Sequence, residues 1–531
     1  MKRLIALTLI LVAATAYVTV KYFNNLNTSG AHAGNIIRTI PADAALVFEF
    51  TNEKSFYDIY SGNDLLNNLI GDEQAKDLDT VRKVLLGNNT IKSFFDDRNV
   101  FISVHPTKQE GINLLLTTSA KEMDIDQLID LSKASGAKML VTPLKIDNKP
   151  GFTIFFNSIK KRLYLINIDG GIFSASFSKE LIASAAAYKP NRGKLPFMLL
   201  PDKQTANSLA NLYVNYKHTD LLFEQLFKHK NIDIFKPFRL LPAQAALNIN
   251  FKNDAVMFSG YTNIDNDEPA SYLNIFTNQQ PVENSLKSIY PSTTAYALNM
   301  AVSDVKKFAA GLTRFHDNAG LKAEREALFA KIKGETGISL KKEFEQLLGN
   351  EFAFVTTRYG ERFALIAVKN GSNLRPVMTN ISNMVNDDVG QFNYNKLPYF
   401  LLGDAFNAFR KPYFRVIDNY LILANTAKEI ESYNDTYFNR KFLNKMDDHR
   451  RFDNLLAEKS NVSFFLQFRN AQQILKAGLK DEYYAAYKNN NLSWKKFYAA
   501  SYQFAASDKN FYTNFCLLLN QPDTTANKNL N

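Results

Sequence analysis

Residues 40–50 read IPADAALVFEF, and residues 290–300 read YPSTTAYALNM. In both stretches a proline marks a turn, and an apolar run typical of a β-strand follows it. The two prolines, Pro41 and Pro291, are 250 positions apart (291 − 41). Self-similarity at a fixed offset indicates an internal repeat, so the pattern predicts that one structural unit begins at both places.

Three further pairs of segments repeat in the same order along the chain. Their offsets are 249 (418 − 169), 252 (464 − 212) and 254 (508 − 254), for residues 169–176 with 418–425, 212–217 with 464–469 and 254–261 with 508–515. Four matches in order at nearly constant spacing are hard to produce by chance. We therefore predict a first copy over residues 36–275 and a second copy over residues 286–520. The polar stretch 266–285 is the predicted boundary.

Short runs of apolar, β-branched and aromatic residues predict the strands of each copy. These runs cover residues 100–104, 112–117, 152–156, 163–168 and 172–176 in the first copy, and 352–356, 363–368, 413–417 and 421–424 in the second. Short polar turns join neighbouring strands, which predicts antiparallel pairing. The clearest helix covers residues 321–333, with Gly334 as its stop.

The expected fold class is α+β. We predict two tandem copies of one α+β unit, with meandering antiparallel sheets and helices packed on one face, plus an N-terminal transmembrane helix.

The first 23 residues have the composition of a membrane anchor. Lys2 and Arg3 precede an uncharged run over residues 4–20, whose 17 residues are at the short limit for a helix that crosses a bilayer. Basic residues ahead of such a run place the N-terminus in the cytoplasm. We expect residues 1–23 to be a single-pass anchor in a bacterial inner membrane, residues 24–35 to be a tether, and the bulk of the chain to be periplasmic.

An alternative is export after signal cleavage. The small residues Ala31 and Ala33 form a candidate cleavage site, although they lie more than ten residues beyond the apolar run. At the other end of the chain, residues 521–531 are polar and are expected to form a disordered tail.

The overall composition is that of a globular protein with a basic excess. Hydrophobic residues make up 46% of the 531 residues and charged residues 22%, which excludes disorder for most of the chain. The net charge of +11 suggests anionic surroundings, such as lipid headgroups or envelope polymers. We expect no nucleic-acid partner, because the charge is spread thinly and no nucleic-acid-binding module is recognisable. The single cysteine, Cys516, lies in an apolar run and is expected to be a small buried hydrophobe.

No local motif points to catalysis, a cofactor or a metal. The six histidines do not pair at i+3 or i+4, and the sequence contains no HExxH, CxxC, Walker A, Rossmann or GxSxG signature. We therefore name no catalytic, cofactor-binding or metal-ligating residue, and we expect no cofactor. The densest ionisable cluster, residues 447–451 (DDHRR), is interpreted as a charged surface loop. The aromatic stretch around Trp494 is interpreted as ordinary packing.

Part of the second copy resembles a known family. Residues 336–340 (TGISL) and 347–354 (LLGNEFAF) are similar to a bacterial cell-envelope family catalogued only as a domain of unknown function. Its members also tend to enter a strand through a proline-containing segment like residues 41–45 (PADAA). The resemblance covers most of residues 36–520 and implies a shared fold. The first copy departs from it at residues 96–99 (DDRN), and no catalytic residue carries over.

Three functional hypotheses follow from the sequence. The first is a membrane-anchored exported envelope protein that binds or scaffolds an envelope protein or lipid without catalysis. One copy would bind and the other support it, with the groove between the copies as the preferred site. The alternatives are a carrier or sensor of an apolar ligand or lipid, which needs a continuous apolar cavity, and a periplasmic hydrolase. Clustered carboxylates or a Ser–His pair in one cleft would favour the hydrolase.

Overall fold

The computed structural model describes residues 36–52, 98–107, 111–120, 139–169, 171–189, 210–228, 241–252, 254–265, 271–488 and 493–520. The chain folds as two compact units; among the described residues, the first unit ends at Val214 and the second begins at Asn215. The predicted anchor, tether and C-terminal tail lie outside the described residues. Within those residues, no helix has both the length and the apolar character needed to span a bilayer.

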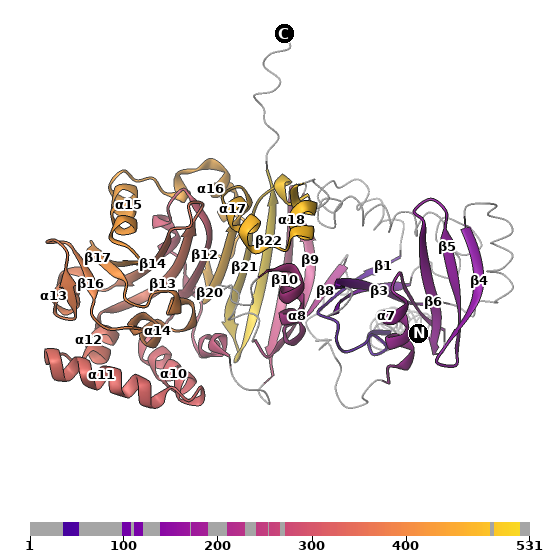
Figure 1. Cartoon of the computed structure of the whole chain (residues 1–531), viewed down its shortest axis with the longest axis horizontal. Coiled ribbons are helices and arrows are strands. Elements are labelled where there is room, and N and C mark those ends of the chain that lie inside the picture. The colour runs from indigo at the N-terminus through magenta and orange to yellow at the C-terminus, as the bar shows by residue number, and fades with distance from the viewer. Residues whose placement is uncertain are drawn as a thin grey trace, which may run out of the picture. The chain divides into compact units, whose positions relative to one another are not determined.

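The first unit contains an antiparallel sheet (Figure 1). Its described strands are β1 (Leu46–Thr51), β2 (Asn99–Thr107), β3 (Gly111–Ser119), β4 (Met139–Ile146), β5 (Lys149–Phe156), β6 (Lys161–Asp169), β7 (Ile172–Ser176) and β8 (Ala210–Asn215). Hydrogen-bonded neighbours give the order β8–β1–β2–β3–β7–β6–β5–β4, with every pair antiparallel. The five strands predicted for the first copy all lie within these elements, and the antiparallel prediction is confirmed.

Side chains along β6 alternate between the two faces of this sheet. Leu163 and Leu165 pack into one apolar cluster with residues of β4, β5 and β7, whereas Ile166 packs into a second cluster. Successive side chains of a strand point to opposite faces, so the two clusters lie on opposite sides of the sheet. The second cluster is closed by helix α7 (Lys179–Ala187), which begins where the Ser178 hydroxyl accepts a hydrogen bond from the Leu181 amide.

The second unit contains a longer antiparallel sheet. Its described strands are β9 (Ala243–Phe251), β10 (Ala255–Ile264), β12 (Thr294–Ala301), β13 (Leu348–Thr357), β14 (Arg362–Val368), β15 (Ser382–Met384), β16 (Val389–Phe392), β17 (Tyr413–Ile417), β18 (Tyr420–Ala424), β20 (Val462–Gln467), β21 (Phe497–Ser507) and β22 (Asn510–Leu519). Their order is β9–β10–β22–β21–β20–β12–β13–β14–β18–β17–β16–β15. The short strands β11 (Val282–Glu283) and β19 (Lys459–Ser460) pair separately. The four strands predicted for the second copy are all present.

Helices and 3-10 turns connect these strands. They are α8 (Tyr216–Leu226), η4 (Tyr272–Asn278), η5 (Leu286–Ile289), α10 (Val305–Asn318), α11 (Lys322–Thr336), α12 (Leu340–Leu347), α13 (Gly371–Asn380), α14 (Leu397–Leu402), η6 (Asp404–Ala408), α15 (Ala427–Phe438), η7 (Leu443–Lys445), α16 (Asp447–Asp453), α17 (Phe468–Gly478), α18 (Asp481–Lys488) and η8 (Ser493–Lys496). In Figure 1, α10 and α11 lie at the end of this unit opposite to α15 and α16.

The helices cover both faces of the second sheet, so the prediction of helices on one face is wrong for this unit. The Phe308 ring of α10 lies 5.2 Å from that of Phe352 on β13, and the Tyr433 ring of α15 lies 5.2 Å from that of Phe363 on β14. Phe363 pairs with Val355, an odd number of residues from Phe352, so the two contacts are on opposite faces. The physical reason is that β13 is buried along nearly its whole length and is apolar at both parities.

One local prediction also needs correction. The predicted helix stop at Gly334 is wrong, because α11 continues to Thr336 and ends at Gly337, whose φ of 74° is left-handed. The predicted polar boundary contains η4, whose side chains at Tyr272, Leu273 and Phe276 are buried.

Candidate functional site

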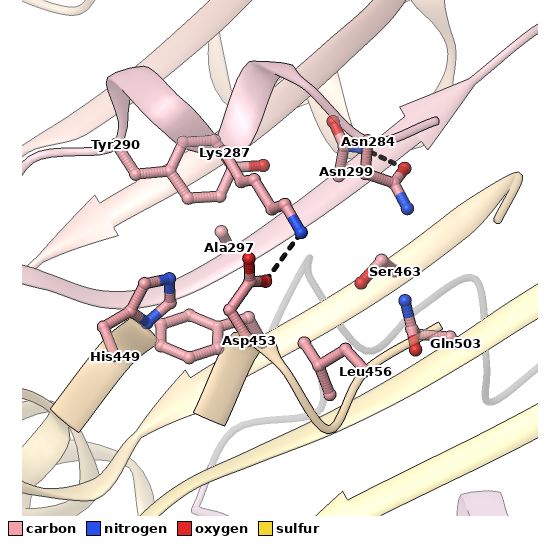
Figure 2. Close-up of a pocket in the computed structure, with 11 residues that line it drawn as sticks. Asn284, Lys287, Tyr290, Ala297, Asn299, His449, Asp453, Leu456, Ser463 and Gln503 are labelled. Carbon is pink, nitrogen blue, oxygen red and sulfur yellow. Dashed lines mark hydrogen bonds and ion pairs between the residues drawn. The ribbon is translucent and has the colours of Figure 1, made fainter. Parts of the chain in front are cut away.

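A pocket with both polar and apolar lining residues opens in the second unit between β12, β20, η5 and α16 (Figure 2). The centres of water-sized molecules can occupy about 30 Å³ of it, which is room for roughly one or two waters. Its lining residues are Asn284, Lys287, Tyr290, Ala297, Asn299, His449, Asp453, Leu456, Ser463, Phe465 and Gln503. These residues are far apart in the sequence: the pairing of β12 with β20 and of β20 with β21 brings the strand residues together, and η5 and α16 supply Lys287, His449 and Asp453.

A buried carboxylate holds one wall of the pocket in place. Glu351, only 4% exposed, accepts hydrogen bonds from the Ser285 amide at 3.0 Å and the Leu286 amide at 3.1 Å. It therefore satisfies backbone donors at the start of η5, which would otherwise lack partners. Because η5 carries Lys287 and leads directly into Tyr290, Glu351 positions both side chains at the pocket.

Asn299 presents an acceptor at the pocket. Its Nδ2 donates to Asn284 Oδ1 at 3.0 Å and to Glu351 Oε2 at 3.3 Å. The amide cannot be turned around without placing its oxygen against the Glu351 carboxylate, since an ionised carboxylate only accepts. Asn299 Oδ1 is thereby left buried and without a hydrogen-bond partner.

Two aromatic residues add further unpartnered groups. The Tyr290 hydroxyl and His449 Nδ1 are buried and make no hydrogen bond, and their residues are only 3% and 5% exposed. Burial, helped slightly by the nearby Glu351, raises the pKa of Tyr290 well above its usual range, so the hydroxyl keeps its proton. Burial also lowers the pKa of His449 to about 4, against a smaller opposing effect of Asp453. The imidazole is therefore neutral at pH 7.

An ion pair spans the pocket. Lys287 Nζ lies 2.6 Å from Asp453 Oδ1, and each side chain is 31% exposed (Figure 2). Asp453 and His449 are four residues apart on α16, so they share one face of that helix. The interpretation of residues 447–451 as a charged surface loop is therefore wrong at His449. The i, i+4 spacing of His449 and Asp453 beside the apolar Phe452 was the sequence signal for a helix with a buried face.

The first unit holds a different arrangement around a buried carboxylate. Glu49 on β1, 5% exposed, accepts from Asn99 Nδ2 at 2.8 Å, from Asn211 Nδ2 at 3.1 Å and from the Tyr213 hydroxyl at 2.6 Å. Three donors thus converge on one carboxylate, and both of its oxygens have partners. We call these four residues the Glu49 cluster.

The first unit also contains a serine, a histidine and an aspartate in hydrogen-bonded order. Ser103 Oγ lies 2.8 Å from His105 Nε2, and His105 Nδ1 lies 3.0 Å from Asp43 Oδ1. This is the hydrogen-bonding order of a hydrolytic triad. Ser103 and His105 are both 0% exposed, however, and Ser103 Oγ also contacts the Leu115 carbonyl oxygen at 3.2 Å. A substrate cannot reach this serine in the folded chain.

Other residues considered from the sequence have structural surroundings. Cys516 is buried as predicted, and burial raises the pKa of its thiol to about 12. Trp494 lies in η8, directly before β21. Among the described residues, no group of three or more His, Cys, Asp or Glu side chains is arranged to hold a metal ion.

Comparison with protein-family models, with curated proteins and with solved structures found no match to this chain.

Proposed function

We propose that this chain is an exported, membrane-anchored envelope protein without catalytic activity, built from two copies of one α+β unit. In this proposal the second copy binds a small polar ligand in the pocket beside Asn299, and the first copy supports the fold. Residues 1–23 are the anchor, and residues 36–275 and 286–520 are the copies.

The strand orders support the duplication. The run β8–β1–β2–β3–β7–β6–β5–β4 corresponds one for one to β20–β12–β13–β14–β18–β17–β16–β15. Helices also occur at equivalent places: α7 and α15 follow β7 and β18, and α8 and α17 follow β8 and β20. Two unrelated α+β folds have little reason to share eight strand positions and two helix positions.

The polar residues at the centre of the two sheets correspond as well. An offset of 250 aligns Glu49 with Asn299, and an offset of 252 aligns Asn99 with Glu351. A carboxylate and an amide thus face each other across neighbouring strands in both copies, with their strands exchanged. Both copies therefore keep one carboxylate–amide hydrogen bond. The carboxylate lies on the first strand of the pair in the first copy and on the second strand in the second copy, so a different group faces the rest of the site.

The contrast between these two centres carries the functional proposal. In the Glu49 cluster both carboxylate oxygens are satisfied by protein donors, and one other atom of the cluster, Asn211 Oδ1, is buried without a partner. In the second copy, three polar groups from Tyr290, Asn299 and His449 are buried beside a pocket without protein partners. Buried polar groups are normally hydrogen-bonded, so three unpartnered groups beside one pocket support a bound molecule there.

The test compares molecules that co-purify with the full-length protein. Small molecules released on denaturation are identified by mass spectrometry for the wild type and for Ser463→Val, which adds apolar volume at the pocket wall. Ser259→Val on β10 is the matched control, because Ser259 is also a partly buried strand serine but lies outside the pocket. We expect a released molecule from the wild type and the control that falls about tenfold in Ser463→Val. Equal release from all three would contradict the proposal.

The hydrolase remains the second candidate because of the Ser103–His105–Asp43 order. Its weakness is the burial of the serine. A fluorophosphonate that labelled wild type but not Ser103→Ala would favour the hydrolase over the binding protein.

A further inference from the structure

One end of the second unit carries the most exposed large hydrophobic side chains of the residues that the structure describes. Tyr359, in the turn between β13 and β14, is 67% exposed, and Phe438, the last residue of α15, is 64% exposed. Single exposed hydrophobic residues are common on folded proteins, so either one alone would need no explanation. The two rings become informative because they belong to one surface.

Backbone hydrogen bonds join the two segments that carry these rings. The Arg358 amide donates to the Thr293 carbonyl oxygen at 2.8 Å. The neighbouring Ser292 amide donates to the Lys441 carbonyl oxygen, also at 2.8 Å. The turn before β14 and the segment after α15 are therefore held against the same short stretch of chain, at the entry to β12.

The surface made by these two segments has an excess of positive charge. We call residues 357–362 and 435–446 the Tyr359 surface. It contains five cationic side chains and two carboxylates, which are Arg358, Arg362, Arg440, Lys441, Lys445, Glu361 and Asp435. The adjoining helix α16 adds two acidic and two basic residues over its first five positions, so it leaves this excess unchanged.

Both carboxylates of the Tyr359 surface already have partners within the protein. Glu361 accepts a hydrogen bond from Ser432 Oγ at 2.7 Å, and Asp435 is paired with Lys441 at 2.9 Å. Arg440 and Lys445 are exposed, and neither has an ion-pair partner among the described residues. These two cations are therefore available to an anionic partner.

An anionic lipid surface fits this combination better than a second copy of the chain does. Aromatic rings favour the headgroup level of a bilayer, and Lys and Arg side chains are attracted to anionic headgroups. Two copies that met through the Tyr359 surface would instead bring like charges together. The net charge of +11 on the whole chain acts in the same direction.

We propose that the Tyr359 surface docks on an anionic lipid bilayer, with the rings of Tyr359 and Phe438 at the headgroup level and with Arg440 and Lys445 against lipid phosphates. The inference goes beyond the proposed function, because it gives the second unit a contact with the bilayer that involves neither the pocket nor its variants.

The experiment places the full-length protein in lipid nanodiscs and labels it with a polarity-sensitive fluorophore. The only cysteine of the chain, Cys516, is buried, so Phe438→Cys supplies an accessible thiol at the surface. Val385→Cys is the matched control, because Val385 is 57% exposed on the β15–β16 hairpin of the same unit. The nanodiscs contain phosphatidylcholine alone or equal parts of phosphatidylcholine and phosphatidylglycerol.

We expect the emission of the label at position 438 to shift to shorter wavelength only in the nanodiscs with phosphatidylglycerol. The label at position 385 should not shift in either kind. A concentration of about 1 M salt should abolish the shift, because the Debye length falls to about 3 Å.

Charge reversal tests the two cations directly. Arg440→Glu combined with Lys445→Glu should lower the equilibrium constant for docking at least about tenfold, because each cation near an anionic leaflet contributes to binding. Lys322→Glu combined with Lys342→Glu is the charge-matched control. Both lysines are exposed, on α11 and α12, and this control should leave docking unchanged.

Three outcomes would overturn the proposal: no shift in either kind of nanodisc, a shift of equal size in phosphatidylcholine alone, or a shift that both double variants keep. A label shielded in native membranes but not in nanodiscs would assign the surface to a protein partner and would also overturn it. If the full-length chain does not enter nanodiscs, the anchor of the proposed function is wrong. The same shift is then required when the chain is added to vesicles of the same two compositions.

Discussion

At the scale of single residues, the account depends on which buried hydroxyls have partners. The Tyr433 hydroxyl donates to the Ile289 carbonyl at 3.0 Å, whereas the Tyr290 hydroxyl has no partner. Tyr433→Phe should lower the free energy of unfolding by about 1 kcal/mol, because it leaves a buried carbonyl unsatisfied. Tyr290→Phe in ligand-free protein should be neutral or slightly stabilising. Urea denaturation of both variants checks the contrast, and a clear loss of stability in Tyr290→Phe would show that its hydroxyl is bonded within the protein.

Two buried histidines predict a dependence of stability on pH. Burial lowers the pKa of His316 and of His449 from 6.5 to about 4 in the folded chain. Between pH 6.5 and pH 4 the unfolded chain therefore binds protons that the folded chain excludes, so stability falls as the pH is lowered through this window and levels off below it. Each histidine accounts for a loss on the order of 2 to 3 kcal/mol.

The matched variants are His316→Phe and His449→Phe. His316 already packs among Phe315, Tyr399 and Phe400, so a phenyl ring suits its site. The unfolding midpoint, measured from pH 4 to pH 7, should change less with pH in each variant than in the wild type. If a variant kept the full pH dependence of the wild type, the replaced histidine would not be a cause of that dependence.

The sequence predicted some residue environments and missed others for a physical reason. The apolar run around Cys516 predicts burial, because a strand segment with apolar residues at both parities must be covered on both faces. The pocket residues give no such local signal. Asn284, Asn299, His449 and Ser463 become neighbours only through strand pairing and helix packing, which a single sequence does not specify.

At the scale of elements, the pairing of β10 with β22 bears on the proposed duplication. Its register places Phe258 opposite Phe515 and Tyr261 opposite Tyr512. Under the proposed duplication, the offset of 254 would make Phe258 equivalent to Tyr512 and Tyr261 equivalent to Phe515, so each pair would be the other with the copies exchanged. This is the reciprocity of a two-fold interface, and the proposed duplication accounts for it.

Gly260 lies at the centre of this register and gives a test. A Cβ atom there would collide with the Ala246 carbonyl oxygen of β9, whereas a Cβ at Gly334 in α11 meets no atom within 4 Å. Gly260→Ala should cost more than about 2 kcal/mol, because backbone atoms must shift. Gly334→Ala should add about 0.5 to 1 kcal/mol by restricting the unfolded chain. The two urea midpoints should move in opposite directions, and a neutral Gly260→Ala would refute the close packing of β9 on β10.

Strands were easier to predict than the ends and partners of elements. Short apolar runs located β5, β6 and β14, since strand faces that are buried need apolar side chains. The end of α11 was misplaced at Gly334 because glycine is tolerated inside a helix, and the left-handed backbone that ends it occurs at Gly337. The prediction missed that helices cover both faces of the second sheet, because it used the pattern of the strands and not the lengths of the helices between them.

At the scale of the whole molecule, the membrane anchor stays a prediction. Full-length protein should fractionate with membranes, and a chain that starts near Asn35 should be soluble, because it lacks the apolar run over residues 4–20. Immunoblots of the membrane and soluble fractions test this prediction for both chains. Mature chains that begin at Gly34 would instead establish signal cleavage. The groove between the copies, favoured from the sequence as the binding site, also stays a prediction.

The central claim is that one copy binds and its counterpart is closed. It is tested most directly by a crystal structure of the chain purified from its own membranes without exchange of bound molecules. The account predicts electron density for a molecule larger than water between Tyr290, Asn299 and His449, and none within the Glu49 cluster. Ordered water alone in the pocket, or a molecule bound at Glu49 instead, would contradict it.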